Sequence, residues 1–429
     1  MSSSSSSSSS PASLASLPAD LHQGILESVP DMASMFSAMA ASSAINRSFR
    51  PYEQSIATKV LKKQLPWYVW EHAVVCQKLA DGTIDTSRLQ FGKFDPMAIR
   101  TCIKAIRRVR DAASTTLVSA RDGLAMSRLH DKVLILADNF FRDCAMTRTQ
   151  CFGHLHDSLR RRGPSEHERI RVEQAIYLFQ MVASLCKNLA IERGSGDRYM
   201  SQCTTRIGYM QLCITSDLMS PWEFYQVMGI QGYFRRAIHG LDCSKLFSER
   251  VMPYMLAGGI NCMHDAIHTF GPPHKTDFLH DLEALALERP QNAFGLIVSR
   301  GHHRTWTRGK TEPFEYHEPF ALRNDWLGFA TWIRMENRQA ELYDNGADLH
   351  PLMYHTIHVL EGRLDLWSAA LWDVRRWREI EETIDTPYVS EEDAKVHWCS
   401  MKTGLDVLLL SESEMEDLRQ HNGHSSVRP

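Results

Sequence analysis

The chain has 429 residues, of which 43% are hydrophobic and 23% charged, proportions typical of globular proteins. A net charge of -3 provides no basic excess, so we expect no nucleic-acid partner. No apolar run reaches the roughly eighteen residues of a membrane-spanning helix, so we expect no membrane partner. The ten cysteines show neither a CxxC pair nor a regular spacing. This pattern predicts reduced thiols in a cytoplasmic and/or nuclear protein.

The chain divides by composition into five segments. Its first residues are dominated by serine. We expect a disordered leader there, because a run of one polar residue type cannot form a core. We expect no secretory signal peptide, because such a signal needs a charged and then an apolar segment. The predicted segments are a leader (1–13), a small helical module (14–65), a connecting segment (66–96), a large helical domain (97–410) and a flexible tail (411–429).

The small helical module is predicted to contain three short amphipathic helices separated by prolines. Pro18 suits a first helical turn, Pro30 ends the first helix, Asp31 can cap the second and Pro51 opens the third. The apolar positions of the three helices are Leu17, Leu21, Ile25 and Val29, then Met32, Met35, Phe36 and Met39, then Tyr52, Ile56 and Val60. A unit of about fifty residues leaves much of its apolar surface in water, so we expect another surface to cover part of it.

The order of these elements resembles the F-box, in the version found in large fungal families of F-box-like proteins. The resemblance rests on Leu17-Pro18, Asp20-Leu21, Ile25-Leu26 and Val29-Pro30, followed by the apolar second helix and a third helix through Val60-Leu61. It implies a non-catalytic subunit of a ubiquitin ligase. The module would bind a Skp-type adaptor and through it a cullin, while the rest of the chain holds an unknown protein substrate for ubiquitin-dependent degradation. The adaptor-binding residues would be Leu17, Pro18, Leu21, Ile25, Leu26, Val29, Pro30, Met32, Met35, Phe36 and Met39.

The rest of the chain is also predicted to be helical. Ser165 with Glu168, and Ser220 with Glu223, have the spacing of capping boxes and precede apolar residues at helical intervals. A third long helix is predicted within residues 352–384. Short β-branched runs lack the alternation of strands, and no repeat of fixed period occurs. We therefore predict an all-α fold with a three-helix F-box-like module followed by a large helical domain.

One pair of histidines has a spacing used by zinc enzymes. His264 and His268 are four residues apart, so both rings can lie on one side of a helix and bind one ion. The acid between them is Asp265, which is one methylene shorter than the glutamate of HExxH and is poorly placed to activate a metal-bound water. A third ligand could come from Cys262, His274 or His280. Since the chain has 20 histidines, one such pair is expected by chance, and we assign no metal site.

No other motif indicates catalysis or a cofactor. The sequence lacks a G-x-S-x-G elbow, a Walker loop and a G-x-G-x-x-G turn before a helix, so we expect no cofactor. The second helix is richer in alanine and methionine than many F-boxes, which carry more leucine there. Two alternatives therefore stay open: a helical scaffold with an F-box-like start and no ligase role, and a zinc hydrolase that uses His264 and His268.

Overall fold

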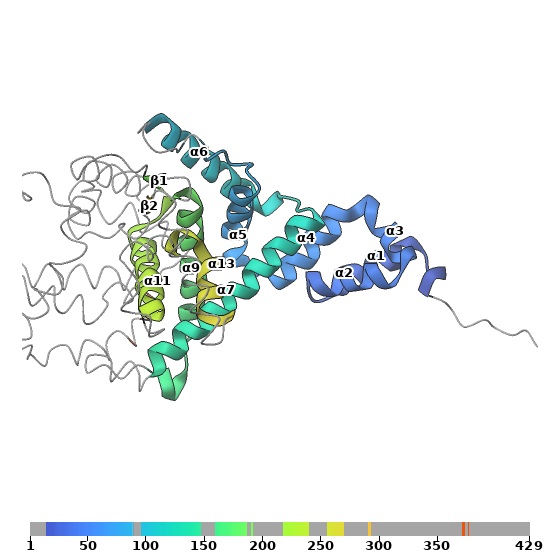
Figure 1. The fold of residues 1–429 in the computed structure, drawn as a ribbon. Helices are drawn as coiled ribbons and strands as arrows, with labels where there is room; N and C mark the ends of the chain where they lie inside the picture. The colour runs from blue at the N-terminus through green and yellow to red at the C-terminus, as the bar shows by residue number, and fades with distance from the viewer. Residues whose placement is uncertain are drawn as a thin grey trace, which may run out of the picture.

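The computed structural model describes residues 14–87, 89, 96–146, 159–186, 190–191, 218–239, 255–269, 291–292, 371–373 and 376, and these residues confirm the all-α fold (Figure 1). The α-helices are α1 (Ala19–Ser28), α2 (Met32–Ala41), α3 (Ser43–Phe49), α4 (Glu53–Gln64), α5 (Trp67–Ala80), α6 (Pro96–Ala112), α7 (Ala120–Met146), α9 (Glu166–Cys186), α11 (Pro221–His239) and α13 (Gly259–His264). The 3-10 turns are η1 (Leu14–Ser16), η2 (Arg50–Tyr52) and η3 (Ala113–Thr115), and η4 (Asp265–Thr269) is a π-helical turn. The extended pairing in the described residues is limited to β1 (Ala190–Ile191) antiparallel to β2 (Gln291–Asn292), with Ala190 opposite Asn292.

The N-terminal segment contains one helix more than the sequence predicts. Helix α1 ends before Pro30, and the Asp31 side chain caps α2 by accepting a hydrogen bond from the Ser34 N–H at 2.7 Å, both as expected. The additional helix is α3, which has seven residues. It is capped by Ser42, and it buries Ile45 and Phe49, which lie one turn apart. Helix α3 therefore supplies core side chains and packs against α1 and α2.

Helix α7 connects the N-terminal helices to the rest of the described structure (Figure 1). Both α2 and α4 pack against it. A methyl group at Gly123 of α7 would lie 2.8 Å from the Met32 Cε, so glycine allows α2 to approach closely. The segment before α7 is held by α4, because Thr58 Oγ1 accepts a hydrogen bond from the Val118 N–H at 2.8 Å and Glu53 Oε1 accepts one from the Ala120 N–H at 3.0 Å. The N-terminal helices thus share one core with α7.

Helix α5 corrects the assignment of residues 66–96 as a connecting segment. Its side chains are apolar on most sides, and eight of its residues are buried. It packs against α9, where the Tyr68 hydroxyl donates to Glu173 Oε2 at 3.0 Å and the Gln174 amide donates to the Tyr68 carbonyl at 3.0 Å. The chain turns only after this helix, at Gly82.

Helices α9 and α11 begin at the two predicted capping boxes. The Ser165 N–H donates to Glu168 Oε2 at 2.8 Å, and the Ser220 N–H donates to Glu223 Oε2 at 2.7 Å. The two helices pack together through Phe179 and other aromatic side chains that also reach α7. The ring pairs are Phe179 with Phe234 at 5.0 Å and Phe140 with Tyr233 at 5.4 Å between centroids. Among the described helices, none is both long enough and apolar enough to cross a bilayer.

Most of the helix predicted over residues 352–384 lies outside the described residues. Within it, residues 371–373 form a turn and not a helix. The Asp373 N–H donates to Glu168 Oε1 of α9 at 3.0 Å, so this backbone group is satisfied by a remote side chain.

Candidate docking surface

Helices α1 to α3 form one end of the described structure, on the far side of α4 from α9 and α11 (Figure 1). The structure divides the eleven predicted adaptor-binding residues into two groups. Leu26, Met32 and Met35 are fully buried against the chain's own core. Their place in the predicted contact set is therefore corrected: they hold α1 and α2 in position and cannot touch a partner in this conformation.

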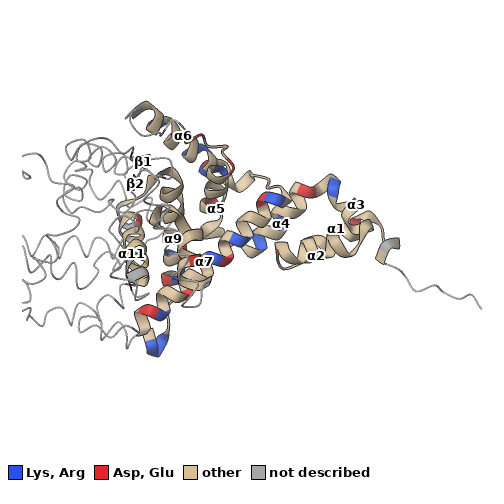
Figure 2. Cartoon of the chain, in the orientation of Figure 1, with Lys and Arg blue, Asp and Glu red and all other residues tan. Residues whose placement is uncertain are grey.

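The other eight predicted residues reach the surface in whole or in part. Leu21 has 52% of its surface exposed, while Ile25, one turn later, and Leu17, just before α1, are half-buried. Helix α2 contributes half-buried Phe36 and Met39 and has no charged residue, as Figure 2 shows. The eight residues are Leu17, Pro18, Leu21, Ile25, Val29, Pro30, Phe36 and Met39, which we name the N-terminal apolar surface.

Polar contacts hold the N-terminal apolar surface in place. His22 of α1 is buried, and its Nε2 lies 2.8 Å from the Leu14 carbonyl, while its Nδ1 lies 3.0 Å from Ser48 Oγ of α3. Since a carbonyl can only accept, Nε2 carries a proton. At the other end of α1, Lys59 of α4 forms a 2.7 Å ion pair with Glu27. The exposed leucine thus stands on a helix that is fixed at both ends.

The two histidines considered as metal ligands lie close together, but their surroundings differ from a metal centre. The rings of His264 and His268 stack with centroids 5.6 Å apart. Asp265 is 3.1 Å from His264 Nδ1 and 3.7 Å from Lys132 Nζ. Burial, with Asp265 adding to it, raises the pKa of Cys262 to about 12, which keeps this thiol protonated.

Within the part of the chain that the structure describes, no three His, Cys, Asp or Glu side chains are arranged to hold a metal ion. Of the other suggested ligands, His274 and His280 lie outside the described residues.

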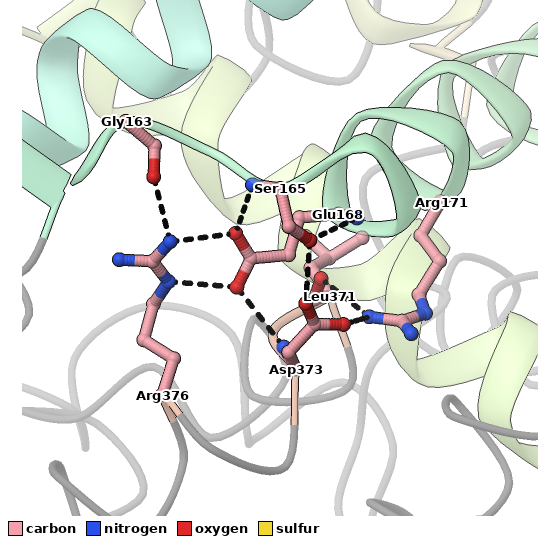
Figure 3. A network of polar contacts seen from close by, with 7 residues as sticks. All are labelled: Gly163, Ser165, Glu168, Arg171, Leu371, Asp373 and Arg376. Carbon is pink, nitrogen blue, oxygen red and sulfur yellow. Dashed lines mark hydrogen bonds and ion pairs between the residues drawn. The ribbon is translucent and has the colours of Figure 1, made fainter.

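A buried polar network lies where α9 begins (Figure 3). Glu168 is fully buried and receives four hydrogen bonds, two on each carboxylate oxygen. Arg376 supplies two of them, at 2.7 and 2.8 Å, and the backbone N–H groups of Ser165 and Asp373 supply the others. Arg376 also donates to the carbonyl of Gly163 at 2.7 Å, where a positive φ of 66° suits glycine.

Asp373 extends this network to a second arginine. Its Oδ1 lies 3.1 Å from Nη1 of Arg171, which is 1% exposed, and its Oδ2 accepts the Ser165 hydroxyl at 2.5 Å. The neighbouring Trp372 is buried against α7, stacked on Phe140 at 5.7 Å. We name residues 371–373 and 376 the docked segment.

The sequence indicates only half of this network. Ser165 and Glu168 are visible as a capping box, but their partners in the docked segment lie about two hundred residues further along the chain, at a separation of 208 residues for Glu168 and Arg376. A buried charge needs a partner. No local pattern shows which of the chain's 48 lysines and arginines would supply it.

Comparison with protein-family models, with curated proteins and with solved structures gives no match for this chain.

Proposed function

We propose that this chain is an F-box-like adaptor, the substrate-recognition subunit of a ubiquitin ligase of the Skp-cullin-F-box type. In this proposal, the N-terminal apolar surface binds a Skp-type adaptor, which connects the chain to a cullin. The larger helical part holds a protein substrate. The chain itself performs no catalytic step.

The observation that carries the proposal is the exposure of Leu21 on a firmly held helix. A large apolar side chain that is 52% exposed gains little from its own fold. Ile25, one turn later on α1, and Leu17, which lies just before the helix, are half-buried and add to the apolar surface. Protein interfaces concentrate binding energy in a few such anchors, surrounded by contacts that exclude water.

The uncharged character of α2 also supports this proposal. The sequence of α2 contains no Asp, Glu, Lys or Arg, so a partner could cover Phe36 and Met39 without desolvating an unpaired charge. Small exposed residues such as Ala33 and Ala40 leave room for a partner's side chains. Both features favour an apolar protein partner over an anionic one.

Co-purification with a Skp-type adaptor tests the proposal. The full chain and a recognised F-box protein are captured in parallel from cells that express the adaptor. The variant Leu21→Ala, alone and with Leu17→Ala, should lower the retained adaptor by about tenfold or more, since truncation of a central anchor costs about 2 kcal/mol. The matched control is Leu117→Ala, because Leu117 is 57% exposed but lies between η3 and α7.

The proposal fails if the unmodified chain retains no adaptor while the recognised F-box protein does. It also fails if Leu117→Ala weakens capture as much as Leu21→Ala. The scaffold alternative is favoured by one observation, the core that α2 and α4 share with α7. The scaffold alternative would be supported if the captured chain is folded and of full length but carries no adaptor.

A further inference from the structure

Three arginines precede the capped start of α9. Arg160, Arg161 and Arg162 are exposed in a helical turn, and Ser165 follows after Gly163 and Pro164. Two of the arginines therefore stand three and five residues before the serine. Protein kinases select substrates by such charge patterns, since an acidic substrate cleft attracts basic residues at fixed distances from the reacting hydroxyl.

The Ser165 hydroxyl is part of the buried polar network. It is half-buried, donates to Asp373 Oδ2 at 2.5 Å and accepts from the Glu168 N–H at 3.2 Å. Figure 3 shows the hydroxyl next to the Asp373 carboxylate, with a dashed line joining the two. A kinase can reach this oxygen only when Asp373 has moved away, so modification would select the state in which the docked segment is open.

We propose that Ser165 is a phosphorylation site for an arginine-directed protein kinase and that its phosphate releases the docked segment from α9. The Ser165 Oγ attacks the γ-phosphorus of ATP, the bond from that phosphorus to the oxygen bridging to the β-phosphate breaks, and ADP leaves. The hydroxyl proton passes to the catalytic base of the kinase. The product carries a charge of about −2 and has no hydroxyl left to donate to Asp373.

The charges around Ser165 determine which contact is lost. The phosphate would replace the hydroxyl that now contacts the Asp373 carboxylate, and the Glu168 carboxylate lies close by, bonded to the Ser165 N–H at 2.8 Å, so both carboxylates repel it. It would also compete with Asp373 for Arg171, because phosphate oxygens are strong acceptors for a guanidinium.

A phosphate at the first turn of a helix is favourable for the helix itself. Helix α9 should therefore remain folded while Asp373, and with it Trp372, leaves its place against α7 and α9.

The start of α11 provides a matched control within the same chain. Ser220 has the same capping geometry, with its N–H 2.7 Å from Glu223 Oε2. The five residues before it, Thr215 to Met219, include no arginine or lysine. The two serines differ in the charge pattern that a kinase would recognise and in their contact with a carboxylate from a remote segment.

The test uses the full chain, magnesium ATP and a purified kinase whose substrates carry arginine three and five residues before the serine. Mass spectrometry of the digest should locate phosphate on Ser165 and not on Ser220. The variant with Arg160→Gln and Arg162→Gln should lose most of the incorporation at Ser165. A synthetic peptide of residues 159–171 is the positive control for kinase recognition.

Hydrogen exchange measures the second half of the proposal. Amides of residues 371–373 should exchange several-fold faster in the phosphorylated chain, and clearly faster than in Ser165→Ala, which loses the hydroxyl but gains no charge.

Three results would each overturn the proposal. The first is a peptide or a chain that stays unmodified at Ser165, and the second is incorporation that is indifferent to Arg160 and Arg162. The third is exchange at 371–373 no faster than in Ser165→Ala. None of these outcomes depends on whether a Skp-type adaptor binds.

Discussion

The N-terminal helices expose an apolar side chain, whereas the start of α9 buries charged ones. Around α1, the chain leaves a leucine half in water and uses a buried histidine and an ion pair to hold the helix that carries it. At α9, the chain buries two arginines and a glutamate, and it satisfies Glu168 with four donors. The first region keeps apolar surface free for another molecule. The second uses charge to fix a remote part of the same chain.

Among the substitutions that test this comparison, removal of the buried glutamate should change the free energy of unfolding most. Glu168→Ala leaves Arg376 buried without its counter-charge, and we expect a loss of about 3–5 kcal/mol in the free energy of unfolding. Glu223→Ala, at the other capping box, removes only capping bonds and should cost about 1 kcal/mol. Urea unfolding with matched m-values compares the two variants. Equal losses would show that Glu168 acts only as a cap.

Two leucines on α1 provide the next comparison. Leu26 is fully buried, and Leu26→Ala should cost about 2–5 kcal/mol in unfolding. Leu21→Ala should change stability by no more than about 0.5 kcal/mol, since about half of its surface is already in water. Thermal or urea unfolding of both variants decides this point. A large loss in Leu21→Ala would mean that its side chain belongs to the fold and not to a docking surface.

Acidification should lower the free energy of unfolding, because a histidine of α5 is buried in its neutral form. Burial, with the charge of Arg110 acting in the same direction, lowers the pKa of His72 to about 3 from its ordinary value of 6.5. Between these values the unfolded chain binds a proton that the folded chain does not, so stability falls as the pH drops below 6.5. At about 1.4 kcal/mol per pH unit, the loss for His72 is roughly 2 kcal/mol by about pH 5.

Urea unfolding near neutral pH and again near pH 5 measures this loss. The variant His72→Leu should lose less stability over the same interval than the unmodified chain. Burial also lowers the pKa of His130 to about 4, so a part of the pH dependence should persist in that variant. Identical pH dependence in the two chains would exclude His72 as a source.

The smallest of these effects concerns the cap of α2. Asp31 accepts the Ser34 N–H at 2.7 Å, and Asp31→Ala should cost about 1 kcal/mol. The matched change at the start of α1 is Pro18→Ala, because Pro18 makes no side-chain capping bond there. Calorimetric melting of the two variants compares them. A loss in Pro18→Ala as large as that in Asp31→Ala would show that the cap is not what distinguishes these helix starts.

Local signals in the sequence predicted much of this fold. The capping boxes of α9 and α11, the end of α1 before Pro30 and the cap at Asp31 each depend on residues within one or two turns. Helix α5 was not predicted, because it is apolar on most sides and its sequence lacks the alternation of apolar and polar faces that indicates a surface helix. Helix α3 escaped because seven residues contain only one apolar repeat.

The candidate surface was predicted only in part. An apolar stripe on α1 and α2 does not show which side chains face the chain's own core, so Leu26, Met32 and Met35 were grouped with the exposed Leu21. The buried polar network depends on a pairing across 208 residues, which no local pattern encodes.

The same separation has a consequence for biosynthesis. Glu168 and Arg171 leave the ribosome long before their partners at Arg376 and Asp373 are made, and at about 5–20 residues per second the delay for the 208-residue separation is roughly 10–40 seconds. During that time the start of α9 holds charges that cannot be buried stably. A chain interrupted before residue 371 would lack both partners and would leave Glu168 without the counter-charge of Arg376.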